Sequence, residues 1–394
     1  MTKPLADQKR PLQVAMVAGE ASGDILAAGL IKEIKRHHPD VHCYGIGGPL
    51  MQGEGFDSLF PMDRLSVMGL VEVLGRLKEL VGIRRQLGDQ LIQNPPDIFI
   101  GIDAPDFNLG LEKQLKAAGI PTTHYVSPQV WAWREGRLKK IKRSVDHMLA
   151  LLPFEASYYQ GHDVDVTFVG HPLADKVAFS PDKGKARQSL SIARQGLVVG
   201  VLPGSRKAEV ARLGELFLTT ARMLRKEVPS VRFIVPCAND KRKVQLLQML
   251  ENYKDLDITL FDGRASDVMA ASDAILIASG TATLEAALHK RPLVVSYRMS
   301  ALTFAIAKRL VKVEHVALPN LLAGRELVPE LLQDEATPEN LCKAMQRALF
   351  DQAYQKELVH EFEKIHQQLK RNASELAYGA VKSVIESHHA TKCA

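Results

Sequence analysis

Two glycine-bearing turns carry residue types that could do chemistry, and each lies between an apolar run and a helix-like segment. The first is in Val14–Asp24 and the second in Ala274–Glu285. Glycine lets a ligand approach the backbone closely, and the free N–H groups of a helix start attract an anion. One such turn in each half of the chain predicts a cleft enzyme that holds a phosphorylated donor on one wall.

A second segment that could bind an anion is Val198–Glu209, an apolar run followed by a Pro-Gly-Ser-Arg turn. Gly204 permits close approach, Ser205 can cap the following helix, and Arg206 offers a planar set of donors to phosphate oxygens. The later turn adds amide and hydroxyl donors from Ser279, Gly280, Thr281 and Thr283. Plain helix capping explains either segment alone, but both together in one domain favour phosphate binding.

Glu285 lies one turn into the second helix-like segment and could accept hydrogen bonds from a ribose diol, as acidic residues do in nucleotide folds. The sequence has no G-x-x-x-x-G-K-[ST] motif, which disfavours a Walker-type ATPase. Neither glycine turn fits G-x-G-x-x-G, so a dinucleotide redox enzyme is also disfavoured.

Carboxylates gather in the first half, where Pro96–Asn108 predicts a strand that ends in Asp103 and Asp106 around Pro105. Glu20 and Asp24 come from the first glycine turn. A carboxylate at a partly desolvated rim is a natural general base, and such a base contributes about 10²–10⁴ in rate. Capping of the helix that follows is the better explanation for Asp106, whereas for Asp103 we favour the catalytic one.

These turns need a scaffold, and short β-rich runs alternating with helical stretches predict parallel sheets covered by helices. At 394 residues the chain exceeds the size of one core, so two Rossmann-like domains are expected. Proline, glycine and charge in Gly170–Arg187 mark the linker, and a helical tail begins at Thr337. We expect strands near 13–18, 41–45, 98–102, 122–126 and 148–152, and near 197–202, 232–235, 258–260, 274–278 and 293–296.

The net charge of +6 suits an anionic partner, whether nucleic acid, phosphorylated substrate or lipid surface. The segment Leu65–Arg85 is apolar with cations toward one end, and it could lie in a membrane interface, line a lipid pocket or form a buried core helix. Its apolar residues include Val67, Met68, Leu70, Leu74 and Leu77. Asp163-Val-Asp165 matches a metal-binding D-x-D pattern, but a surface turn is the better interpretation, and the four cysteines have no metal-like spacing.

An ordered series of short blocks resembles the lipid-A-disaccharide synthase family of Gram-negative bacteria. The blocks fall between residues 12 and 330, and any one alone is only modestly specific. They are Val17–Asp24, Gly45–Gly48, Gly101–Asn108, Tyr125–Trp133, Leu151–Glu155, Phe168–Pro172, Leu202–Arg206, Ser279–Glu285 and Leu318–Leu321.

The resemblance implies an α/β fold with two Rossmann-like domains facing a cleft, the GT-B glycosyltransferase architecture, with C-terminal helices folded back onto the first domain. The expected boundaries are 1–172 for the acceptor and lipid domain, 173–350 for the UDP-sugar domain and 351–394 for the C-terminal helices. It also implies an inverting transfer of 2,3-diacylglucosamine from UDP to 2,3-diacylglucosamine 1-phosphate, which gives a β-1,6 disaccharide 1-phosphate and UDP.

The family's residue roles carry over block by block. Asp103 is the expected base and Glu20 its helper, while Asn320 joins the donor-binding set. Ser22, Gly23 and Asp106 join the apolar residues of Leu65–Arg85 on the acceptor, lipid or membrane side. No metal or other cofactor is expected, because an arginine and a helix start can stabilise the leaving diphosphate.

The expected partners are the two acylated sugars and the inner-membrane lipid surface, with the protein in the cytoplasm and peripherally attached to that membrane. A homodimer stays open. One alternative is a UDP-sugar 2-epimerase of the same fold, which needs no acceptor pocket or apolar flank. A nucleic-acid-binding protein that uses the basic stretch Arg134–Arg143 is disfavoured, because no RNA-binding aromatic signature or zinc spacing accompanies it.

Overall fold

The computed structural model describes residues 10–65, 70–128, 130, 135–299 and 314–393. The chain forms two compact units: unit 1 comprises Met1–Pro172 with Arg371–Ala394, and unit 2 comprises Leu173–Lys370. Within the described ranges, no helix is both long and apolar enough to cross a bilayer.

Unit 1 contains a seven-stranded sheet in the order β3-β2-β1-β4-β5-β6-β7, and every neighbouring pair is parallel. Its central strands β1 and β4 are almost entirely buried, as expected for apolar runs covered on both faces. The strands are β1 Gln13–Ala18, β2 His42–Gly47, β3 Asp57–Pro61, β4 Ile98–Ile102, β5 Thr122–Tyr125, β6 His147–Ala150 and β7 Val166–Phe168.

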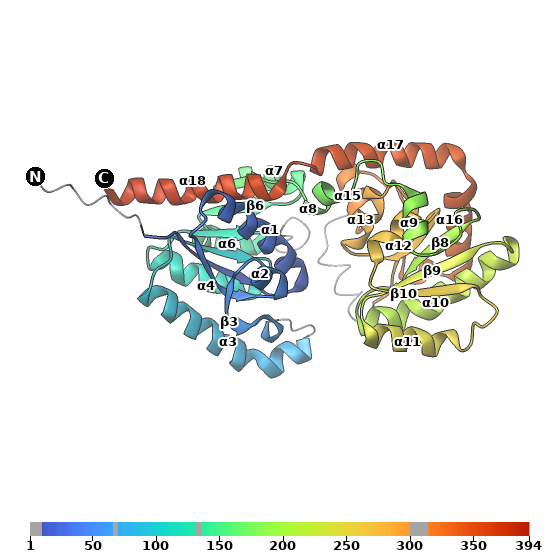
Figure 1. Cartoon of the computed structure of the whole chain (residues 1–394), viewed down its shortest axis with the longest axis horizontal. Coiled ribbons are helices and arrows are strands. Elements are labelled where there is room, and N and C mark those ends of the chain that lie inside the picture. Colours follow the sequence, from blue (N-terminus) through green and yellow to red (C-terminus); the bar gives the residue numbers. More distant parts are fainter. Residues whose placement is uncertain (1–9, 66–69, 129, 131–134, 300–313, 394) are drawn as a thin grey trace, which may run out of the picture. The chain divides into compact units, whose positions relative to one another are not determined.

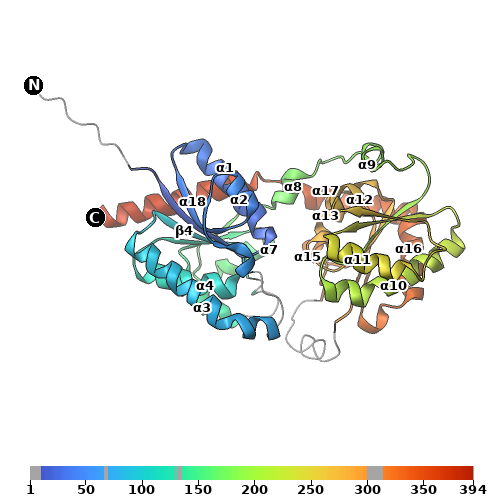
Figure 2. The ribbon, with the colours of Figure 1, turned by 60° about the horizontal axis from the view of Figure 1, so that its bottom comes forward.

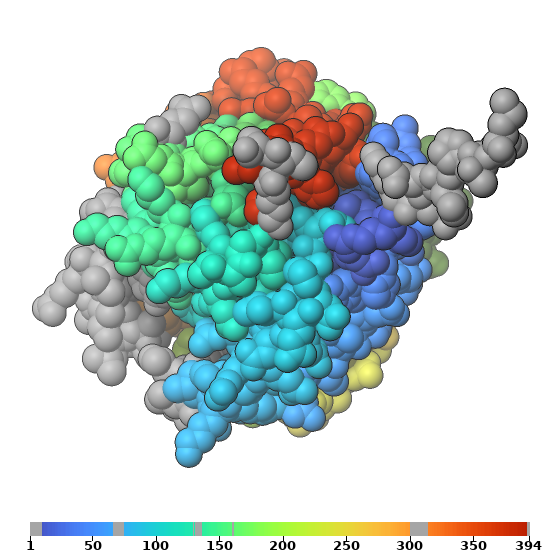
Figure 3. All heavy atoms as spheres, turned by 90° about the vertical axis from the view of Figure 1, so that its left-hand side faces the viewer, coloured from blue at the N-terminus to red at the C-terminus, as the bar shows by residue number. Residues whose placement is uncertain are grey.

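Helices cover both faces of this sheet (Figures 1 and 2). α3 and α4 pack together on one face, and α1 and α18 pack together on the other. Figure 3 shows the red atoms of α18 between blue segments, which include α1, and green ones. The helices are α1 Ala21–His37, α2 Pro49–Gly53, α3 Leu70–Gln93, α4 Pro105–Ala117, α6 Leu138–Ser144, α7 Pro153–Gln160 and α18 Ala373–Cys393.

Unit 2 contains a six-stranded parallel sheet in the order β10-β9-β8-β11-β12-β13. A large core cluster lies where α10 and α16 pack on the sheet, and α12 and α13 contact the strands as well. The strands are β8 Val198–Leu202, β9 Arg232–Cys237, β10 Ile258–Asp262, β11 Ala274–Ala278, β12 Leu293–Tyr297 and β13 Glu330–Leu332. The helices are α8 Pro172–Lys176, α9 Lys183–Ser189, α10 Lys207–Glu227, α11 Asp240–Leu250, α12 Ala265–Ala271, α13 Ala282–Leu288, α15 Leu318–Ala323, α16 Pro338–Phe350 and α17 Gln352–Leu369.

Both sheets are doubly wound, and in each the strand order reverses between the first strand and the fourth. These points lie between β1 and β4 in unit 1 and between β8 and β11 in unit 2. In open α/β sheets, ligands bind beyond the carboxyl ends of the strands at such a point. The prediction of two parallel-sheet α/β units is confirmed, whereas the edge strands β3, β7 and β13 escaped it; they have three to five residues each, and none of these residues is fully buried.

The C-terminal helices do not pack as one group, which corrects the prediction for residues 351–394. α17 contacts α13 and α15 inside unit 2, and only α18 packs on α1 in unit 1. The reason lies in the apolar face of α17, where Leu358, Phe362 and Leu369 are buried. Tyr354, at the start of the same face, donates to the carbonyl of Leu327 at 3.0 Å and holds α17 within unit 2.

Candidate active site

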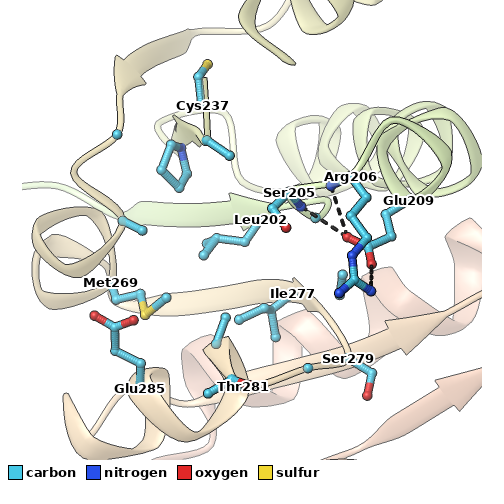
Figure 4. Close-up of a pocket in the computed structure, with 18 of the residues that line it drawn as sticks. Leu202, Ser205, Arg206, Glu209, Cys237, Met269, Ile277, Ser279, Thr281 and Glu285 are labelled. Atoms are coloured by element: carbon cyan, nitrogen blue, oxygen red, sulfur yellow. Dashed lines mark hydrogen bonds and ion pairs between the residues drawn. The ribbon is translucent and has the colours of Figure 1, made fainter. Parts of the chain in front are cut away.

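A cavity of about 560 Å³ opens in unit 2 at the carboxyl ends of β8, β9, β10 and β11 (Figure 4). It lies at the reversal of strand order, where a ligand is expected. Of the predicted donor-binding residues, those that line it are Gly204, Ser205, Arg206, Ser279, Gly280, Thr281 and Glu285. The structure therefore brings together two turns that are far apart in the sequence.

The β11–α13 turn presents open polar groups to this cavity. Gly280 has φ of +154°, in a region that L side chains rarely adopt. Ser279 N–H donates to the carbonyl of Ser296 at 3.1 Å, which fixes the start of the turn. Within the described residues, the N–H groups of Gly280 and Thr281 have no hydrogen-bond acceptor. Both residues are exposed and line the cavity. This turn can therefore donate to an anionic ligand.

The β8–α10 turn differs from the prediction, because it already holds a carboxylate. Glu209 accepts hydrogen bonds from the N–H groups of Ser205 and Arg206 at 3.1 and 3.2 Å, and it contacts Arg206 Nη1 at 3.4 Å (Figure 4). Gly204, with φ of +116°, makes room for it, since a Cβ there would lie 2.6 Å from Glu209. The predicted Ser205 cap is wrong, because Glu209 caps α10 instead. Arg206 is exposed and held at the cavity rim.

Glu285 lines the cavity from the first turn of α13, and other side chains contact it from behind. Burial raises the pKa of the Glu285 carboxyl above its usual value, while a hydrogen bond from Ser266 acts in the opposite direction. The Ser266 hydroxyl is also 2.9 Å from Nε2 of His289, which is buried. Glu285 is thus a half-buried carboxylate that can accept hydrogen bonds from a ligand while Ser266 and His289 fix its place.

Two predicted donor contacts are corrected. Thr283 is fully buried and donates its hydroxyl to the carbonyl of Gly280 at 2.7 Å, so it shapes the turn from inside. Asn320 is fully buried outside the cavity lining: its amide nitrogen donates to Val328 O and Glu330 Oε1, at 2.9 and 2.7 Å. Its amide oxygen accepts from two backbone N–H groups of the same segment, which leaves its polar atoms committed to the fold.

Sequence reasoning missed the residues that close the cavity on the β9 and β10 side. They are Pro236 and Cys237 at the end of β9, Ala238 directly after it, and Gly263, Arg264 and Ala265 after β10. Arg264 has φ of +56°, and its guanidinium donates to Ser189 O at 2.8 Å and pairs with Asp267 at 3.0 Å. The signal available in the sequence was Gly263-Arg264, which comes shortly after the strand predicted near 258–260 and at the same sheet edge as the two recognised turns.

A second cavity, of about 330 Å³, lies in unit 1 and contains the predicted acid–base residues. Its polar lining includes Glu20, Asp103 and Asp106, and its apolar lining includes Leu77 and Val81 of α3. Leu77 and Val81 are both nearly half exposed. Asp106 lies in the first turn of α4, and among the described residues no side chain caps the start of this helix. The Asp106 carboxylate pairs with Arg137 at 2.5 Å instead. The cavity thus combines carboxylates with an apolar wall.

Strand order explains why Glu20 and Asp103 share this cavity. β1 and β4 are neighbours with Ala18 opposite Ile102, so the turns that follow them leave the sheet side by side. Gly19 allows the close approach, because a Cβ there would lie 2.9 Å from the Cβ of Ala104. The geometry supports a joint role for the two carboxylates, which stays a prediction.

Other predicted residues of the acceptor side lie elsewhere. Ser22 is exposed on α1 and is not among the lining residues. Gly23 is buried, and a Cβ there would contact Ala18 and Ile102 at 3.4 Å. Asp24 is buried and caps α2 by accepting three backbone N–H groups at 3.0–3.1 Å. Gly23 and Asp24 are therefore structural, because packing encloses both.

The remaining part of the predicted lipid segment is only partly described. Val67 and Met68 lie outside the described residues, and Leu70 and Leu74 belong to α3 with side chains that the description leaves out. Asp163 of the D-x-D pattern is an exposed turn residue with φ of +52° that pairs with Lys142 at 2.9 Å. In the described residues, no group of three or more His, Cys, Asp or Glu side chains is arranged to hold a metal ion.

A family model described as lipid-A-disaccharide synthetase matches residues 14–383. The chain therefore belongs to the lipid-A-disaccharide synthase family. It is 56% identical over 375 residues to the lipid-A-disaccharide synthase of Pseudomonas syringae pv. tomato, covering 95% of this chain and 98% of the relative. It is 54% identical to that of Pseudomonas aeruginosa UCBPP-PA14, with the same coverage. Like these lipid-A-disaccharide synthases, the protein is a glycosyltransferase of lipid A biosynthesis.

Solved structures confirm the GT-B fold of this lipid-A-disaccharide synthase family member. UDP-GlcNAc 2-epimerase from Neisseria meningitidis aligns with a TM-score of 0.66 at 15% identity, covering 94% of this chain and 100% of that one. The calicheamicin glycosyltransferase CalG4 aligns with a TM-score of 0.61 at 16% identity, covering 96% and 99%. At such identities the likeness shows the fold alone, so the epimerase alternative has support only from the architecture.

Proposed function

We propose that this protein transfers 2,3-diacylglucosamine from UDP to the 6-hydroxyl of 2,3-diacylglucosamine 1-phosphate, with inversion at the anomeric carbon. The bond from the anomeric carbon to the diphosphate oxygen breaks, and a β-1,6 bond to the acceptor oxygen forms. The hydroxyl proton goes to a base, and UDP leaves as an anion. The observation that carries the proposal is that Glu20 and Asp103 line the same cavity in a member of this glycosyltransferase family.

In this reaction Asp103 is the base that takes the acceptor proton, and Glu20 orients the hydroxyl. Asp103 lines the cavity directly after β4 and is half-buried, so its carboxylate has both access to a ligand and reduced contact with water. A carboxylate within reach of the acceptor hydroxyl can take up its proton as a general base. The apolar lining residues Leu77 and Val81 suit an acylated acceptor.

The donor's diphosphate is assigned to the unit 2 cavity. The amides of Gly280 and Thr281 and the guanidinium of Arg206 supply hydrogen-bond donors and positive charge to a leaving group that gains negative charge. Glu285 accepts from the ribose hydroxyls. These groups supply the charge stabilisation that a divalent ion supplies in other glycosyltransferases, and we propose that the transfer needs no metal.

Binding of UDP and turnover test the two cavities separately. Asp103→Asn keeps the shape of the side chain and removes the base, so turnover should fall by about 10²–10⁴ while UDP affinity is unchanged. Arg206→Ala should weaken UDP binding by about 10- to 10²-fold, the effect of losing a charged hydrogen bond. Arg212→Ala, an exposed arginine on the same helix outside the cavity, is the matched control. Normal turnover by the Asp103→Asn enzyme would remove Asp103 as the base.

The substrates are tested by mass spectrometry of the products formed from both acylated sugars. A disaccharide 1-phosphate and UDP support the proposal. A UDP-sugar isomer formed without acceptor would support the epimerase instead. Reactions with excess EDTA should proceed at the same rate, and a loss of rate that Mg²⁺ restores would overturn metal independence.

We also propose that the α3 face with Leu77 and Val81 contacts the inner-membrane surface, where the acylated acceptor lies. The two side chains are one helical turn apart and nearly half exposed. Replacing both by serine should reduce cosedimentation with anionic lipid vesicles and lower activity on vesicle-borne substrate. Ile92→Ser, at a similarly exposed site near the other end of α3, is the control. Unchanged vesicle binding by the double variant would refute the contact.

A further inference from the structure

One buried amide in unit 1 ties together the two strand ends that carry the proposed catalytic carboxylates. Asn108 of α4 is fully buried, and its Nδ2 donates to Val17 O, Ile102 O and Asp103 O at 3.2, 3.3 and 2.8 Å. Val17 lies near the end of β1, before the turn with Glu20, whereas Ile102 is the last residue of β4 and Asp103 follows it. The amide therefore spans the point where the strand order reverses.

The Asp103 turn requires support of this kind, because its backbone is unusual. Asp103 and Ala104 have φ of +51° and +43°, two consecutive left-handed residues that are not glycine. Such conformations persist only where the surrounding structure over-determines them, and they cluster at functional sites. The Asp103 N–H donates to Tyr125 O at 2.8 Å, and Asn108 holds the Asp103 carbonyl. Both peptide groups of Asp103 are thereby fixed from inside the protein.

The position of Asn108 is itself set by tight packing of α4 on the sheet. Gly101 of β4 has no side chain, and a Cβ there would lie 2.9 Å from the Cβ of Asn108 and 2.1 Å from Glu112 Oε1. One turn beyond Asn108, Glu112 Oε1 is 2.7 Å from Nδ1 of His124 on β5, and both side chains are fully buried. This pair holds α4 against β5. Asn108 thus acts from a rigid support.

We propose that Asn108 is a positioning residue for the transfer, which holds the Asp103 carboxylate and the Glu20 turn at a fixed separation. The inference rests on the proposed role of Asp103 as the base. Asn108 does not line the cavity, so it touches the backbone of Asp103 and not a ligand. An asparagine fits the task because its two amide hydrogens can be shared among three carbonyl oxygens, whereas an ionised aspartate has none to donate.

The experiment compares Asn108→Ala with the loss of a buried hydrogen bond that also ends on α4. Ser144 of α6 is fully buried and donates to the carbonyl of Leu109 at 2.9 Å; Leu109 follows Asn108 in sequence, but this bond does not involve the Asp103 turn. Asn108→Ala should lower kcat by about 10²-fold, the usual cost of a small misplacement of a catalytic group. KM for both acylated sugars and the Kd for UDP should stay unchanged. Ser144→Ala should lower the Tm and leave kcat as it is.

A double variant tests whether Asn108 acts through Asp103. If it does, Asp103→Asn combined with Asn108→Ala should be as slow as Asp103→Asn alone, because there is no base left to position. A further loss equal to the single-variant effect would overturn the inference. So would an Asn108→Ala enzyme with the kcat of Ser144→Ala.

The two proposals fail in distinguishable ways. A fast Asp103→Asn enzyme removes the base assignment and the inference with it, whereas a slow Asp103→Asn enzyme with a fast Asn108→Ala enzyme removes only the inference. If Asn108→Ala does not fold, Asn108→Ser retains one hydroxyl donor and carries the test. It should then show a kcat between those of wild type and Asp103→Asn with unchanged KM, and a wild-type kcat would contradict the inference.

Discussion

Acid should destabilise unit 2 through His289, which supports the wall of the donor cavity. His289 is 6% exposed, and Nε2 lies 2.9 Å from the Ser266 hydroxyl. Burial, reinforced by the nearby charges of Arg291 and Lys290, lowers the pKa of His289 from 6.5 to about 4. The folded protein therefore binds fewer protons than the unfolded chain in this interval, so the contribution of His289 to stability is complete above pH 6.5 and is lost as pH falls toward 4.

The size of the effect follows from the interval. Each unit of pKa corresponds to about 1.4 kcal/mol, so the shift from 6.5 to about 4 amounts to about 3 kcal/mol. His289→Gln keeps a polar atom near Ser266 and cannot take up a proton. Between pH 8 and pH 4, the free energy of unfolding should therefore fall by about 3 kcal/mol more for wild type than for His289→Gln. Any constant cost of the substitution cancels in that difference.

The assay must report on unit 2. Neither tryptophan of the chain, Trp131 or Trp133, falls in the sequence range of unit 2, so tryptophan fluorescence is not a suitable probe of that unit. Hydrogen exchange of peptides from β8 and β11 should be followed instead, in a urea series at each pH. His360→Gln is the control, because His360 is exposed on α17. Parallel pH dependences for wild type and His289→Gln would refute the reasoning, and so would an equal change in the His360→Gln protein.

Three further predictions concern unit 1. Gly101→Ala would place a Cβ 2.1 Å from the buried Glu112 Oε1, so the free energy of unfolding should fall by about 3 kcal/mol or more; a wild-type urea midpoint would contradict this packing. Asp24→Asn weakens a carboxylate that accepts three N–H groups and should cost about 2 kcal/mol or more in a thermal or urea melt, whereas an unchanged midpoint would show that these bonds matter little. Burial raises the pKa of Cys43 to about 11, so iodoacetamide at pH 8 should alkylate it far more slowly in the native protein than in urea, as peptide mass spectrometry would show; equal rates would contradict its burial.

Much of the fold and part of the site are predictable from the sequence because their signals are local. A buried parallel strand is a short apolar run, and the residues after it define a turn whether or not the rest of the chain is known. The turns at Glu20, Asp103, Gly204 and Ser279 were found in this way, and they lie in four of the nine ordered blocks that indicated the family. Edge strands such as β13 have weaker signals, because they are short and half-buried.

Partners of polar groups are not local, and the sequence alone assigned several of them wrongly. Ser205 was named as a possible cap of α10, but Glu209 takes that place because Gly204 leaves room for its side chain. Asn320 was expected to bind the donor, but folding encloses it among backbone groups near Val328. Which donor meets which acceptor depends on the segments that packing brings near, and a pattern of residue types does not specify that.

The alternation of strands and helices, the chemistry of the turns and the family can be read from the chain alone, because these features depend on residues that are neighbours in sequence. Folding was needed to show that Glu20 and Asp103 share a cavity, that α17 and α18 belong to different units, and that Asn108 holds two strand ends. These are consequences of strand order and of burial. A fully buried amide must find acceptors, and the packing of α4 over Gly101 determines which carbonyl groups it reaches.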